Sequence, residues 1–343
     1  MTVDSPIRLS ILDLSPVPSG SSTREALLNT LDLARYADEL GFERYWLAEH
    51  HNTPLIASSA PEVMIGHVAS ITGRIRVGSG GVMLPNYAPL KVAETFRMLE
   101  ALHPGRIDLG IGRAPGTDQT TALALRRSRA ALSADDFPEQ LAELLAYFSG
   151  NFPDNHPFRR VTAIPSGVDT PQVWLLGSSD FSARLAAELG LGFAFAHHIN
   201  PLSAVEALRL YRERFRPSSH LAEPRSMLTV SVVCAETDEE AATLASSAEL
   251  TLLRFQTGNF RTTLPSVAEA TGYPYTDFER EIIRANRSRL LAGSPETLRA
   301  KLAHFREQTS VDEIMITTMI HDHALRLRSY ALLADALIER RRG

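Results

Sequence analysis

Cysteine is almost absent from this chain of 343 residues, in which Cys234 is the single one. One cysteine cannot form a disulfide within the chain, and this scarcity is typical of proteins from a reducing compartment. Cys234 lies in the apolar run 230–235, where a small buried core residue is more common than a nucleophile. We therefore expect neither a disulfide framework nor thiol chemistry.

An excess of basic charge and long apolar runs are also missing. The formal net charge is -5, and a protein that binds nucleic acid needs a basic face to neutralise phosphates. The first ten residues lack the pattern of a signal peptide, and no window of the sequence approaches the apolar length of a membrane span. We expect a cytoplasmic protein with no nucleic-acid partner and no membrane partner.

Short apolar runs alternate with amphipathic helical stretches, which is typical of parallel β/α folds. The predicted strands are residues 7–13, 44–49, 75–81, 106–112, 172–176, 192–196, 226–235 and 313–317. The predicted helices are residues 23–40, 61–72, 90–102, 137–148, 181–189, 202–215, 238–255, 295–308 and 324–340. An open doubly wound sheet usually stops near six strands. Eight strands with crossover helices therefore predict an α/β fold, a closed (β/α)8 TIM barrel.

Two segments interrupt this alternation. Residues 113–133 lack a helical period and are predicted to form a long active-site loop. Residues 256–277 hold Gly, Thr, Pro and Tyr without a period, and a helical stretch at 278–291 follows them. Insertions of this kind often form lids. We predict one domain over residues 1–343, with an insertion after strand seven, at residues 256–291, that acts as a lid.

Polar residues and glycines follow the predicted strands, where barrel enzymes place their reactive groups. They are Asp13, Glu49, His50, His51, Gly80, Gly81, Arg113, Ser178, Ser179, His197 and His198. Glycines let a backbone approach a ligand, while an arginine and a helix N-terminus favour a phosphate. Ser179 and Ser182 open a helix and could bind an anion or simply cap that helix. We expect a phosphate-bearing cofactor here, and we assign Asp13 and His197 to the substrate.

Two other kinds of site are less compatible with the sequence. Gly110 and Gly112 resemble the start of a dinucleotide motif, but the third glycine and a directly following helix are missing. His50 and His51 are neighbours on a strand and point to opposite faces, so they cannot share a metal ion. His321 and His323 lie where the last helix begins, where a solvated cap is more common. We predict no metal site.

Five stretches, taken in order, resemble the bacterial luciferase-like monooxygenase family. They are residues 45–52 (YWLAEHHN), 77–85 (VGSGGVMLP), 104–113 (PGRIDLGIGR), 175–179 (LLGSS) and 193–198 (FAFAHH). The likeness extends from about residue 11 to residue 295. It implies a (β/α)8 barrel that uses reduced FMN and O2 to oxidise a small organic substrate through a flavin hydroperoxide. A separate flavin reductase would supply the reduced FMN.

The resemblance also implies roles for individual residues. Arg113, Ser179 and Ser182, in the turn that starts at Ser178, match the phosphate-binding groups. Gly80 and Gly81 match a non-prolyl cis peptide beneath the flavin ring. His50 matches the catalytic histidine and Glu49 a residue close to the flavin. A homodimer would pack around the second and third helices.

The sequence departs from the luciferases in two places. Gly112 stands where they have a reactive thiol, and the insertion after strand seven differs, so neither light emission nor a long-chain aldehyde substrate is implied. Two alternatives stay open beside the monooxygenase. One is a reductase or dehydrogenase of the same superfamily that uses F420 or FMN, and the other is a flavin-carrying barrel without turnover.

Overall fold

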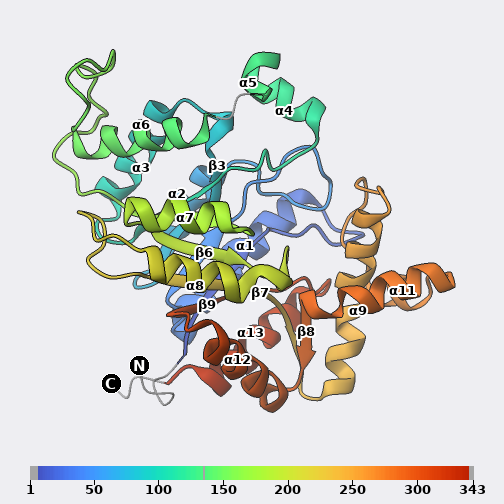
Figure 1. Cartoon of the computed structure of the whole chain (residues 1–343). Helices are drawn as coiled ribbons and strands as arrows, with labels where there is room; N and C mark the ends of the chain where they lie inside the picture. The colour runs from blue at the N-terminus through green and yellow to red at the C-terminus, as the bar shows by residue number, and fades with distance from the viewer. Residues whose placement is uncertain (1–6, 134–135, 340–343) are drawn as a thin grey trace.

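The computed structural model describes residues 7–133 and 136–339 (Figure 1). Eight of its strands form a closed parallel barrel: β1 (Arg8–Asp13), β2 (Arg44–Leu47), β3 (Arg76–Met83), β4 (Ile107–Gly112), β5 (Gln172–Gly177), β6 (Gly192–Ala196), β7 (Ser226–Cys234) and β9 (Glu313–Thr317). The barrel closes because β9 pairs with β1 on one side and with β7 on the other. The prediction of a (β/α)8 barrel is confirmed.

Helices cover the outside of the barrel (Figure 1). The main ones are α1 (Thr23–Leu40), α2 (Pro61–Ile71), α3 (Pro89–Leu102), α6 (Phe137–Ser149), α7 (Asp180–Leu189), α8 (Ala204–Arg214), α9 (Asp238–Gln256), α12 (Pro295–Thr309) and α13 (His323–Leu337). Their ends follow local sequence signals, since Ser22 and Glu25 form a capping box at the start of α1 and Gly41 ends it with φ 88°. The last predicted helix ran to residue 340, which lies outside the described residues.

Strand side chains alternate between the barrel interior and the helix layer. The interior cluster contains Leu12, Trp46, Trp174, Ala194, Met227 and Met315. Below this cluster lies a buried ionic network, in which Arg44 binds Asp108 at 2.7 Å and Glu313 at 3.0 Å. Asp108 also accepts from the indole of Trp46 at 2.9 Å. The network occupies the barrel interior, so the open end for a ligand is the end where the strands terminate.

The segment predicted as a long loop after β4 is partly helical, and that prediction is wrong. It contains α4 (Gln119–Arg126) and α5 (Arg129–Ser133). Asp118 caps α4 by accepting from the backbone N–H groups of Thr120 and Thr121. Ala122 is the one buried residue of α4. The helix has only eight residues, a length at which periodicity does not distinguish a helix from other structure.

The end of the segment after β7 was also predicted wrongly. The helical stretch expected to reach residue 291 ends as α11 (Asp277–Asn286), followed by the 3-10 turn η3 (Arg287–Arg289) and by a short strand, β8 (Leu290–Gly293). β8 pairs in parallel with the outer end of β7, from Ser231 to Cys234. A strand of four residues depends on this partner, which lies far away in the sequence.

The remainder of this segment, residues 256–289, packs beside α9 and is joined to the loop after β1 (Figure 1). It includes α10 (Val267–Thr271). The backbone N–H of Leu264 donates to the carbonyl of Val17 at 2.9 Å, and the N–H of Ser19 donates to Leu264 at 2.8 Å. Its role as a lid stays a prediction. No helix among the described residues is long and apolar enough to cross a membrane.

Candidate active site

Glu49 connects the ends of β2 and β3 at the open end of the barrel. Its side chain is fully buried. One carboxylate oxygen lies 2.9 Å from Nε2 of His51, and the other accepts from the backbone N–H of Met83 at 3.0 Å. Tyr87 lies near the same carboxylate, and burial together with Glu49 raises the pKa of Tyr87 well above its usual value. Both oxygens of Glu49 are therefore already bound within the protein.

His50 follows Glu49 and faces a different environment. Its backbone N–H donates to the carbonyl of Ser58 at 3.0 Å, but its buried Nδ1 has no partner among the described residues. Burial lowers the pKa of His50 to about 4; nearby Glu49 opposes the shift, while His51 and His198 add to it. The imidazole is neutral at pH 7, and one of its ring nitrogens is available to a ligand.

The two histidines after β6 separate in the structure. His197 is buried against α12, with its ring 4.7 Å from that of Phe305, and burial lowers its pKa to about 4. His198 lies close enough to His50 to lower the pKa of that residue, and its Nδ1 is 3.2 Å from the carbonyl of Thr229. Of the pair, His198 is therefore the one at the open end, although the sequence analysis assigned His197 to the substrate.

Alternation along β6 does not identify His198. Ala194 points into the barrel, whereas Phe193 and Phe195 pack against the helices. The strand ends at Ala196, however, and both histidines lie in the turn that follows it, where the alternation of a strand no longer applies.

Asp13, the other residue assigned to the substrate, is buried between the barrel and α13. Its carboxylate binds Arg326 at 2.5 Å, the hydroxyl of Tyr45, and the backbone N–H of Ser15 at 2.8 Å. Burial disfavours its charged form, but these three partners together hold the pKa of Asp13 below its usual value. This geometry favours a structural role, because the carboxylate has partners on both oxygens and no exposed surface.

The peptide bond between Gly80 and Gly81 is cis, as the resemblance implied. The pairing of β3 with β4 shifts its register here, between Ser79 and Val82. A Cβ atom on Gly80 would lie 2.5 Å from Leu12 Cδ1 and 3.2 Å from Trp46 Cβ. Because these neighbours belong to the packed barrel interior, a side chain at position 80 would displace them. The glycine thus leaves bare backbone at the open end of the barrel.

Arg113 and the start of α7 lie together, although they follow different strands. The exposed guanidinium of Arg113 lies 4.3 Å from the ring centre of Phe181 in the first turn of α7. Ser179 occupies the N-cap position, but its side chain makes no capping hydrogen bond. Simple capping by this serine is therefore not what the structure shows. Its hydroxyl and the N–H groups of the first turn are positioned to bind an anion.

Ser178 and Ser182 complete this turn. The carbonyl of Ser178 accepts from Nδ2 of Asn200 at 2.9 Å, which ties the turn to the loop after β6. Ser182 is buried, and a Cβ atom on Gly177 would lie 2.4 Å from its Oγ. Glycine at position 177 thus allows the helix to start close to the strand. The structure places Arg113 beside the first turn of α7, the region that also contains Ser178, Ser179 and Ser182, and their role in binding a ligand stays a prediction.

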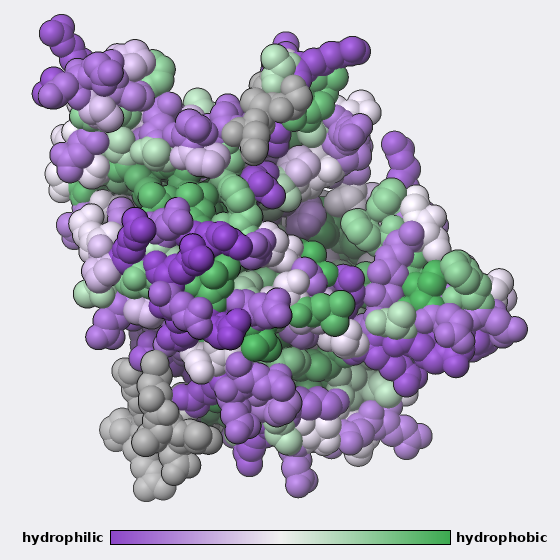
Figure 2. All heavy atoms as spheres, viewed as in Figure 1, coloured by the Kyte–Doolittle hydropathy of each residue, from purple (hydrophilic) through white to green (hydrophobic). Residues whose placement is uncertain are grey.

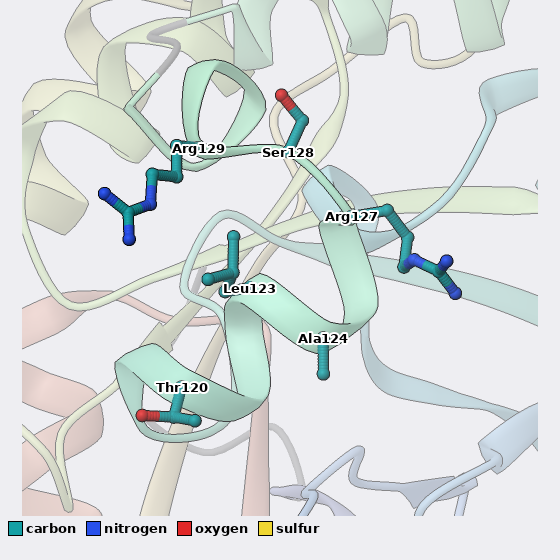
Figure 3. A pocket seen from close by; sticks show the side chains of 6 residues that line it. All are labelled: Thr120, Leu123, Ala124, Arg127, Ser128 and Arg129. Carbon is teal, nitrogen blue, oxygen red and sulfur yellow. The ribbon is translucent and has the colours of Figure 1, made fainter.

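A cavity of about 540 Å³ lies beside α4 and α5, away from these residues. It is lined by Thr120, Leu123, Ala124, Arg127, Ser128 and Arg129. Figure 3 shows that the side chains of Arg127 and Arg129 point away from each other. None of the predicted site residues lines this cavity. Figure 2 shows a hollow in the molecular surface, between the α4–α5 segment and the segment after α9.

Histidines, the Gly80–Gly81 peptide and the N-terminus of α7 all lie at the open end of a (β/α)8 barrel, which is the end where barrel enzymes place their reactive groups. The chain belongs to the luciferase-like monooxygenase family, whose model matches residues 7–313. Members of this family are oxidoreductases.

Three relatives illustrate how closely this chain is matched. It is 43% identical, over 97% of both chains, to a luciferase-like monooxygenase of Escherichia coli (strain K12). It is 37% identical to the N-acetyl-S-alkylcysteine monooxygenase of Bacillus subtilis (strain 168), over 98% of this chain and 100% of the relative. The crystal structure of apo-MsnO8 superposes with a TM-score of 0.88 at 41% identity, covering 96% of this chain and 97% of that one.

Proposed function

We propose that the protein is a flavin-dependent monooxygenase that uses reduced FMN and O2 to oxidise a small organic substrate. The observation that carries the proposal is the pairing of Arg113 with the uncapped N-terminus of α7. This arrangement fits the phosphate of FMN, because a guanidinium and free helix N–H groups both favour a dianion. When bound, the reduced flavin supplies the electrons for O2 activation.

The chain's own residues would position the flavin and exclude water from it. The Gly80–Gly81 backbone would support the ring, and Glu49 would keep the loop after β2 against β3. His50 would act in the oxygen chemistry. Because its pKa is about 4, it would act as a neutral imidazole that donates or accepts a hydrogen bond. We propose His198 rather than His197 as its neighbour at the substrate.

Two partners follow from this proposal. The Gly110–Gly112 stretch lies within β4 and does not open a helix, so it provides no dinucleotide site of the usual kind. A separate flavin reductase would therefore supply reduced FMN. Helices α2 and α3 expose Val63, Met98 and Leu102, an apolar surface that supports a homodimer.

The test is anaerobic titration of the protein with reduced FMN and, separately, with reduced F420. Arg113→Ala should weaken binding of reduced FMN by roughly ten-fold or more, because it removes a charge-assisted contact. Arg184→Ala is the matched control, since Arg184 lies on α7, is exposed and pairs with Asp180. Equal FMN affinity in Arg113→Ala and the wild type would place the phosphate elsewhere.

The reaction class requires a second measurement. With FMN, NADH and a flavin reductase present, O2 uptake should rise when a substrate is added. N-Acetyl-S-alkylcysteines are the first candidates, given the name of one relative. Tight binding of F420 alone, with hydride transfer and no O2 uptake, would favour the reductase or dehydrogenase alternative. FMN binding without any turnover would favour a carrier.

A further inference from the structure

Arg289 is the last residue of η3 and stands directly before β8. Its Nη1 donates to the backbone carbonyl of Ile199, in the loop that follows β6. Because β8 pairs with β7 only from Ser231 outward, the start of β8 lies above the end of β6. The segment after β7 thereby carries a guanidinium to the open end of the barrel.

The neighbours of Arg289 belong to the proposed active site. Ile199 directly follows His198, whose Nδ1 faces the carbonyl of Thr229. Burial lowers the pKa of His198, and the charge of Arg289 lowers it further. His198 in turn lies near His50. His50, His198 and Arg289 thus follow one another across the open end of the barrel, from the loop after β2 to η3.

The guanidinium of Arg289 is only partly used by the protein. Of its five N–H donors, one is bound to Ile199. No carboxylate in residues 7–133 or 136–339 forms an ion pair with it. Its side chain is partly exposed. The remaining donors are therefore available to a ligand.

The acidic residues at the strand ends are already bound to other groups. Glu49 is held by His51 and by the backbone N–H of Met83. Asp13 is paired with Arg326 in the outer layer. The histidines near Arg289 are neutral at pH 7, since their pKa values are lowered. An anionic group that enters beside His198 would therefore be attracted by the charge of Arg289. Neither Glu49 nor Asp13 would offer it a free carboxylate that repels it.

We propose that Arg289 binds a carboxylate of the substrate, so that the substrate is a small organic acid. The inference rests on the proposed function and adds the chemical class of the substrate. A guanidinium recognises a carboxylate through two parallel hydrogen bonds. Binding would also tie the segment after β7 to the barrel, because Arg289 belongs to that segment.

The experiment measures binding by anaerobic calorimetry to the protein loaded with reduced FMN. The probes are N-acetylmethionine, N-acetylphenylalanine and octanoate, each compared with its methyl ester, which has the same body without the charge. At least one acid should bind the wild type roughly ten-fold or more tightly than its ester. Arg289→Gln should remove that preference by weakening the acid and leaving the ester unchanged, and Arg289→Lys should restore part of it.

Arg287→Gln is the matched control, because Arg287 is an exposed arginine of the same turn. It should keep the preference for the acid. Equal binding of acid and ester to the wild type would overturn the proposal, as would no binding of any acid at about 1 mM. An equal loss for acid and ester in Arg289→Gln would also overturn it. If reduced FMN fails to bind the wild type, the proposed function fails. If reduced FMN binds normally and one of these contrary outcomes is found, only the role of Arg289 fails.

Discussion

His197 offers a direct test of how burial changes the chemistry of a histidine in this barrel. Only 3% of its surface is exposed, and its Nδ1 has no hydrogen-bond partner in the described part of the chain. Burial, with a smaller contribution from His198, lowers the pKa of His197 to about 4. In the unfolded chain a histidine has a pKa of about 6.5.

The sign of the pH effect follows from these two values. Because the folded pKa is the lower one, the unfolded chain binds a proton first as the pH falls. The contribution to stability is fully present above about pH 6.5 and is lost as the pH falls toward 4. The free energy of unfolding should therefore be about 2 kcal/mol lower at pH 5 than at pH 7.5 because of His197 alone.

The substitution His197→Phe should remove this loss. Phenylalanine keeps an aromatic contact with Phe305 but neither titrates nor leaves a polar atom unpaired. Urea unfolding of both proteins at pH 7.5 and pH 5 would be followed by the fluorescence of the buried Trp46 and Trp174. Between these pH values the variant should lose about 2 kcal/mol less than the wild type.

A matched variant separates this effect from a general change in α12. His304 is an exposed histidine of the same helix, so His304→Phe should follow the wild type at both pH values. Equal losses in His197→Phe and the wild type would refute the reasoning. If a folded His197→Phe protein no longer turned over substrate, the result would instead support the substrate-binding role predicted for His197 from the sequence.

Three further substitutions test other parts of the structure. His50→Asn should bind FMN with nearly normal affinity, but the product formed per O2 consumed should fall about 10²-fold or more, with peroxide released instead. An unchanged product yield would exclude His50 from the oxygen chemistry. Asp13→Asn leaves the buried Arg326 without its counter-charge and should destabilise the fold by about 3–5 kcal/mol in urea unfolding, so a change below about 1 kcal/mol would contradict the structural role. Leu102 lies on α3 with 69% of its side chain exposed, so Leu102→Glu should convert a dimer into monomers in light scattering. Leu202, which is 90% exposed, is the control, and Leu202→Glu should leave the dimer intact. A monomeric wild type would disprove the dimer.

Much of the fold can be predicted from the sequence because its signals are local. Strand and helix periods, the capping box at Ser22 and the terminating Gly41 each depend on a few neighbouring residues. The polar residues that follow consecutive strands can also be grouped by sequence alone, since parallel strands in a barrel end on the same side. Arg113 and Ser179, which are far apart in the chain, belong to one predicted site for this reason.

The tertiary structure decided which side chains face the ligand and which are used within the protein. Asp13 meets Arg326 across 313 positions, and no local pattern indicates that pair. His197 and His198 are adjacent and chemically identical, so only the conformation of the turn after β6 separates the one packed on α12 from the one near His50. β8 exists because the outer end of β7 offers it free backbone groups, and its pairing carries Arg289 to the open end. Periodicity within the chain determined the barrel, whereas contacts between distant segments determined its chemistry, because hydrogen bonds and burial depend on neighbours in space.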